Sequence, residues 1–156
     1  MALLRRIVIA ILVTATTGAV SASTASQDDA AQVFLTARYT FVTSVRRIPP
    51  SVMTELLVRM KYDARLADPG ASFNSTDVID PSYPMRRLIL AGIDARSWFV
   101  SYEHGGRGYH RHLVVFTERD GRPQLAYAGT FLPDAATVEE LRQLVRNGSM
   151  QEGGEF

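Results

Sequence analysis

The chain has 156 residues, of which 46% are hydrophobic and 21% are charged, a composition that excludes an intrinsically disordered protein and is typical of one globular domain. Lys and Arg number 17 against 16 Asp and Glu, which gives a formal net charge of +1. Proteins that bind nucleic acids through the phosphate backbone carry a strongly basic face, so we expect no nucleic-acid partner here.

The first 22 residues have the three parts of a secretory signal peptide. Arg5 and Arg6 form a positive segment, residues 7–13 form an apolar run, and Val20-Ser21-Ala22 places small residues at a cleavage site. The apolar stretch is shorter than the about 20 residues that span a bilayer. We therefore expect residues 1–22 to be removed, leaving a periplasmic or secreted protein with no permanent membrane anchor. The chain has no cysteine, so no disulfide can stabilise it.

Two helices are predicted at the start of the mature chain. Apolar residues spaced three or four apart, from Ala30 to Val45, predict a helix over residues 28–46, which Pro49 and Pro50 end. A second helix is predicted to begin near Ser51, with an apolar face that continues to Ala64. Because the break between the helices is short, we expect them to form an antiparallel hairpin. A loop is predicted over residues 68–85.

The second half of the chain is typical of an antiparallel sheet followed by a helix. Segments rich in β-branched and aromatic residues predict strands over 86–93, 97–103, 109–118 and 123–131. Asp120-Gly121 indicates a tight hairpin, and Thr137 with Glu140 predicts a capped helix that ends near Gly148. We therefore expect one α+β domain over residues 23–148, with an N-terminal helical hairpin, a four-stranded antiparallel meander and a C-terminal helix packed on the sheet. Residues 149–156 are predicted to be a flexible tail.

The expected hairpins place a group of polar residues at one end of the sheet. If Gly106 and Arg107 form a two-residue turn, Glu103 faces His110 and Ser101 faces His112. Alternate side chains share a face of a sheet, so one face would hold Ser101, Glu103, His110, His112 and Tyr127. A three-residue loop instead would exchange the faces of one strand.

This group leads to two functional hypotheses. The first is a small exported binding protein without a cofactor and without enzymatic activity, whose partner is a small ligand or an extracytoplasmic protein. Its candidate binding residues are Ser101, Glu103, Arg107, His110, His112 and Tyr127. The alternative is a hydrolase that uses Glu103, His110 and His112, either as ligands of a divalent metal or as a Glu–His acid–base pair.

Overall fold

The structure is a computed structural model that describes residues 27–60 and 63–153. The predicted signal peptide lies outside these residues. Three α-helices and a mostly antiparallel sheet of seven strands form an α+β fold, which confirms the predicted class. Within the described ranges, no helix is both long enough and apolar enough to span a membrane.

The sheet is larger than the predicted one of four strands. Its strand order is β1-β3-β4-β5-β6-β7, and β2 pairs in parallel with the same edge of β3 that β1 borders. The strands are β1 (Thr40–Val42), β2 (Leu66–Ala67), β3 (Arg86–Ile93), β4 (Ser97–His104), β5 (His110–Arg119), β6 (Arg122–Phe131) and β7 (Gln151–Glu152). The predicted strands match β3 to β6 closely, whereas β1, β2 and β7 were not predicted. Gln151 and Glu152, which the sequence places in a flexible tail, form β7 and pair with β6.

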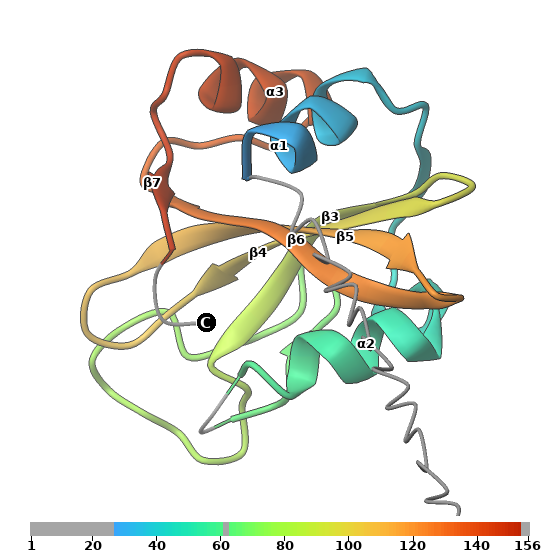
Figure 1. Cartoon of the computed structure of the whole chain (residues 1–156). Coiled ribbons are helices and arrows are strands. Elements are labelled where there is room, and N and C mark those ends of the chain that lie inside the picture. Colours follow the sequence, from blue (N-terminus) through green and yellow to red (C-terminus); the bar gives the residue numbers. More distant parts are fainter. Residues whose placement is uncertain (1–26, 61–62, 154–156) are drawn as a thin grey trace, which may run out of the picture.

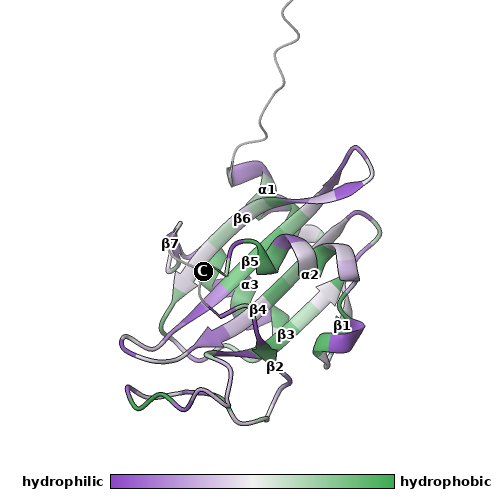
Figure 2. Cartoon of the chain, turned by 90° about the horizontal axis from the view of Figure 1, so that it is seen from below, coloured by the Kyte–Doolittle hydropathy of each residue, from purple (hydrophilic) through white to green (hydrophobic). Residues whose placement is uncertain are grey.

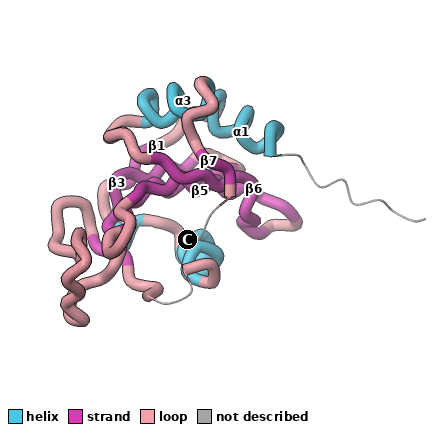
Figure 3. Tube along the Cα trace, turned by 90° about the vertical axis from the view of Figure 1, so that its left-hand side faces the viewer, coloured by secondary structure: helices cyan, strands magenta, loops and turns pink. Residues whose placement is uncertain are grey.

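The helices lie on both sides of this sheet (Figure 1). They are α1 (Gln27–Thr36), α2 (Pro50–Leu57) and α3 (Val138–Arg146), with a short 3-10 helix, η1 (Val45–Arg47), before α2. Figure 3 shows α1 and α3 together above the edge-on sheet. The helix α2 covers the opposite face (Figure 1).

The predicted N-terminal helical hairpin is wrong, because the first helix ends at Thr36 and the chain then joins the sheet. Arg142 of α3 donates hydrogen bonds to the carbonyls of Phe34 and Ala37, at 3.3 Å and 2.5 Å. These bonds satisfy carbonyls at the C-terminal end of α1, where a positive charge is also favourable. Phe41, predicted to lie on the helix's apolar face, is instead in β1 and is 50% exposed.

The second helix is also shorter than predicted. The chain leaves the α-helix after Leu57, and the amide of Met60 donates to the carbonyl of Leu57, a tighter turn than that of an α-helix. Met60 is nevertheless buried, as its apolar spacing predicted. The C-terminal helix agrees with the sequence: Thr137 and Glu140 form the predicted capping box, and Leu141 is fully buried.

Each face of the sheet has its own hydrophobic core. Val52 and Leu56 of α2 pack with Val100, Val114 and Phe116 on one face. On the other face, Phe34 of α1 and Leu141 of α3 pack with the residues Phe99, Leu113, Val115, Tyr127 and Phe131. Figure 2 shows hydrophobic residues along the middle of the strands and hydrophilic residues toward the hairpins. The ends of the strands are therefore where polar groups can gather.

The β4–β5 pairing differs by one residue from the predicted pairing. The loop between the strands covers residues 105–109, so His104 pairs with His110, Glu103 with Arg111, and Tyr102 with His112. The β5–β6 turn forms as predicted, with Asp120 and Gly121 both at positive φ and Phe116 opposite Leu125. A bulge between Val115 and Phe116 then shifts the rest of that pairing by one residue, so Val115, not Val114, faces Tyr127.

Candidate metal centre

All three histidines of the chain meet at one end of the sheet, on the face that α2 covers. His104 ends β4 and lies directly opposite His110, which begins β5. His112 is two residues further along β5, so it shares a face with His110. Arg86 of β3 pairs with His104 and extends the same row across the sheet.

The three imidazoles are close enough to hold one metal ion. One ring nitrogen from each histidine lies within 4.8 Å of the other two. The ring centroids are 4.6 Å apart for His110 and His112, and 5.1 Å apart for His104 and His110. Tetrahedral zinc with Zn–N bonds of about 2.0–2.1 Å needs nitrogens about 3.3 Å apart, so ring movements of less than about 1 Å suffice.

Two of these rings each have a nitrogen that is available to a metal ion. Nδ1 of His110 lies 2.5 Å from the carbonyl oxygen of Gly108. A carbonyl can only accept, so Nδ1 carries the proton in this contact and the lone pair on Nε2 is available to a metal. Nδ1 of His104 is buried and has no hydrogen-bond partner within the described part of the chain. An unsatisfied buried nitrogen costs about 1–3 kcal/mol, which a metal bond would offset.

Burial also keeps two of the rings neutral. It lowers the pKa of His104 to about 4, helped by the positive charges of Arg86 and His110. It lowers the pKa of His112 to about 3, helped by His110, His104 and Arg86. The ring of His112 stacks on that of the fully buried Tyr102, with centroids 4.7 Å apart. At neutral pH these imidazoles are therefore in the form that binds metals.

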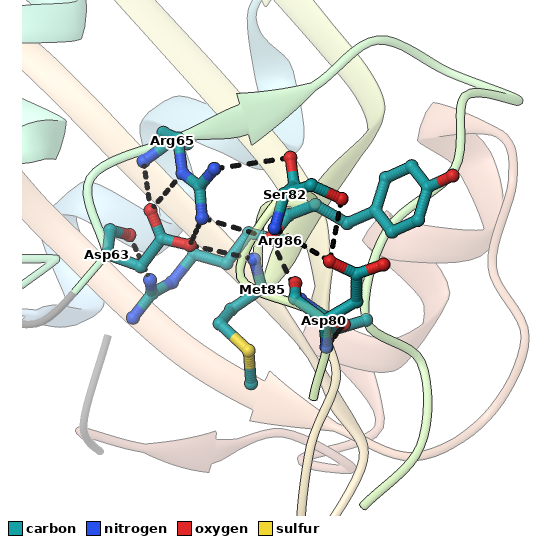
Figure 4. Close-up of polar contacts among 8 residues, drawn as sticks. Asp63, Arg65, Asp80, Ser82, Met85 and Arg86 are labelled. Carbon is teal, nitrogen blue, oxygen red and sulfur yellow. Dashed lines mark hydrogen bonds and ion pairs between the residues drawn. The ribbon is translucent and has the colours of Figure 1, made fainter. Parts of the chain in front are cut away.

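Arg86 connects the histidines to a polar network that Figure 4 shows in close-up. Its Nη1 donates to the carbonyl of Asp63 at 2.5 Å, and its side chain is buried. The Asp63 carboxylate accepts from Arg65 and from the backbone amide of Met85. Arg65 in turn donates to the carbonyls of Ser82 and Tyr83, so the network fastens the end of loop 68–85 beside β3.

Glu103 lies on the other face of the sheet and is not part of the histidine cluster. Its carboxylate accepts from Arg87 at 2.5 Å and from the hydroxyl of Tyr109. Burial, followed by the hydrogen bond and charge of Glu103, raises the pKa of Tyr109 to about 12. The guanidinium of Arg87 also lies 4.4 Å from the ring centroid of Phe73. These contacts give Glu103 a structural role and remove the geometry of the expected Glu–His pair.

The other predicted site residues do not form one group either. Ser101 and Tyr127 are buried and, like Glu103, face the layer of α1 and α3. Arg107 is exposed in the β4–β5 loop. The structure therefore brings together His110 and His112 of the predicted set, and it separates them from Ser101, Glu103 and Tyr127.

Sequence reasoning missed His104, the third member of the cluster. The signal was present, because the three histidines all lie within residues 104–112 and flank a glycine-rich turn. The assumed two-residue turn placed Glu103, and not His104, opposite His110. A one-residue change of register exchanges the faces of a strand. The predicted register therefore put Glu103 beside the histidines, where the structure has His104.

A pocket adjoins His110 at the edge of the sheet. Its volume is ≈ 630 Å³, and it is lined by His110, Thr130, Phe131, Leu132, Pro133, Ser149 and Gln151. Thr130 pairs with both His112 and Gln151, so these three side chains project from the same face. Thr130 and Gln151 therefore extend the histidine row to the edge of the sheet, where the pocket lies.

The sequence matches no family model, and no curated protein or solved structure matches it.

Proposed function

We propose that this protein is an exported binding protein whose ligand is a divalent transition-metal ion, held by His104, His110 and His112. The observation that carries the proposal is the convergence of three ring nitrogens within 4.8 Å of one another, from two neighbouring strands. The proposal keeps the binding role expected from the sequence. It takes the metal from the alternative hypothesis, with His104 in the place of Glu103.

The donor set favours zinc over calcium or magnesium. Imidazole nitrogen suits Zn²⁺, Cu²⁺ and Ni²⁺, whereas Ca²⁺ and Mg²⁺ prefer oxygen ligands. Three histidines leave one position of a tetrahedral ion without a protein ligand, and among the described residues the cluster contains no fourth His, Cys, Asp or Glu. Such an open site is typical of exchangeable or reactive zinc, in contrast to the four-ligand sites that stabilise small folds.

Zinc titration of the mature protein tests the proposal. We expect one Zn²⁺ per chain by calorimetry, and loss of at least about 100-fold in affinity for His104→Ala. Glu103→Gln is the matched control, because it alters the neighbouring residue on the opposite face and leaves the three imidazoles unchanged. We expect it to bind zinc within about 2-fold of the wild-type protein.

A spectroscopic measurement makes the test independent of how the variants fold. In the wild-type protein, imidazole NMR signals from all three histidines should move when one equivalent of Zn²⁺ is added. Absence of stoichiometric binding would contradict the proposal. So would a result in which Glu103→Gln abolishes binding while His104→Ala retains it.

Export is proposed on the sequence of the leader. Expression of the full chain in a bacterium should give a periplasmic protein whose intact mass corresponds to cleavage after Ala22 or a few residues later. Recovery of the uncleaved chain in the membrane fraction would contradict this part of the proposal and would leave the metal site unaffected.

A further inference from the structure

Resting on the proposed metal site, we infer that the open position of the metal takes the carboxylate of a small organic anion, whose apolar body lies in the pocket beside His110. The inference depends on two observations: the charge around the histidines, and the composition of the adjoining pocket.

The charge of the site favours an anion in the open position. Coordinating imidazoles are neutral ligands, so a divalent ion held by three of them would keep its full charge. The buried guanidinium of Arg86 lies in the same cross-strand row. Neither adjoining carboxylate is a member of the histidine cluster: Glu103 binds Arg87 and Tyr109 on the opposite face, and Asp63 accepts from Arg65 and the Met85 amide while its charge also acts on Arg86. A ligand that brings one negative charge would compensate this excess.

The pocket is suited to an organic anion that has an apolar part. Its lining combines the apolar Phe131, Leu132 and Pro133 with the polar Thr130, Ser149 and Gln151. A volume of ≈ 630 Å³ falls within the about 300–1,000 Å³ typical of small-molecule sites. Because His110 is both a proposed metal ligand and part of the pocket wall, an anion on the metal can extend into this space.

Cobalt in place of zinc gives a direct readout of the open position. The mature protein is loaded with Co²⁺ and titrated with benzoate, with its neutral isostere benzamide, and with azide, while the visible spectrum of the cobalt ion is recorded. We expect azide and benzoate to change the spectrum, and benzoate to bind at least about 10-fold more tightly than benzamide.

One variant tests the pocket without touching the metal ligands. Leu132 is 73% exposed, so Leu132→Glu places a negative charge at the pocket wall without loss of core packing. We expect it to weaken benzoate binding about 5–10-fold and to leave Co²⁺ and azide binding within about 2-fold. Val33→Glu adds the same charge beside Thr117 and Arg119, at the other end of β5 from His110, and should leave benzoate binding unchanged.

The outcomes separate this inference from the proposed function. If Co²⁺ does not bind, the metal site itself fails. If Co²⁺ and azide bind but benzoate does not, the metal site stands and the carboxylate ligand is overturned. Equal binding of benzoate and benzamide, or equal benzoate binding by the Leu132→Glu variant, likewise overturns the inference.

Discussion

Asp63 joins the segment before β2 to the segment before β3. Its carboxylate accepts from the backbone and the guanidinium of Arg65 and from the amide of Met85, and its side chain is only 16% exposed. The hydrogen bond from Arg65 is the main reason that its pKa lies below the ordinary value of 3.8. The ionised form of Asp63 therefore contributes to the stability of the fold.

We predict that Asp63→Asn lowers the free energy of unfolding at pH 7 by about 1–2 kcal/mol. A carboxylate with a lowered pKa stabilises the folded state above its unfolded pKa, and this contribution is lost as the pH falls through the folded pKa. The difference between the wild-type protein and the variant should therefore shrink below about pH 4. Urea unfolding at pH 7 and below pH 4 measures this difference in the free energy of unfolding. Asp77→Asn, at an exposed position, is the control. An equal difference at low pH would refute this electrostatic explanation.

The sequence predicts that His110 and His112 lie together, but it does not predict that His104 joins them. His110 and His112 share a face because they are two residues apart on one strand, a relation that the sequence contains. Whether Glu103 or His104 joins them depends on the conformation of residues 105–109, where Gly106 and Gly108 adopt positive φ. Short sequence patterns do not determine that conformation.

The position of loop 68–85 depends on close backbone contact with the start of the β4–β5 loop. A Cβ atom at Gly105 would lie 1.7 Å from the backbone oxygen of Asn74, so only glycine fits there. The amide of Gly105 also donates to the carbonyl of Met85 at 2.9 Å. The loop and the histidine-bearing hairpin therefore pack as a unit.

We predict that Gly105→Ala costs about 1–3 kcal/mol and detaches loop 68–85, because the added methyl group must displace the backbone of Asn74. Hydrogen exchange should show faster exchange at the amides of Asn74 and Tyr83. Gly108→Ala is the control: its positive φ adds about 1–2 kcal/mol of strain, but no atom lies within 4 Å of the new methyl group. If Gly105→Ala leaves both amides protected, the contact does not hold the loop.

Local sequence patterns predicted the strands β3 to β6 but not the strand β1. The strands β3 to β6 were predicted because β-branched residues, aromatic residues and the Asp-Gly turn all indicate the same structure. Residues 37–46 have helical spacing, yet Thr40–Val42 pairs with β3. That pairing depends on residues about fifty positions away, and such tertiary contacts override local propensity.

In the whole molecule, the proposed metal site joins two strands whose other parts lie between two hydrophobic cores. A ligand that binds only the folded state stabilises it by about 2.7 kcal/mol at a concentration one hundred times its Kd. For a domain of this size we predict that Zn²⁺ then raises the midpoint of thermal unfolding by about 10 °C. Calorimetry measures the shift, which should be absent for His104→Ala. Mg²⁺ at the same concentration should leave the wild-type midpoint unchanged.

The folded loop also limits how the protein can be produced. Asn74-Ser75-Thr76 is an acceptor sequence for N-linked glycans, and the side-chain nitrogen of Asn74 donates to the carbonyls of Asp80 and Tyr83 at 2.9 Å and 2.8 Å. A sugar attached to that nitrogen during synthesis in a eukaryotic secretory pathway would replace one of these hydrogens and occupy buried space. Such a host should therefore yield protein whose loop cannot close, whereas Thr76→Ala would remove the acceptor and keep Asn74 available to the loop.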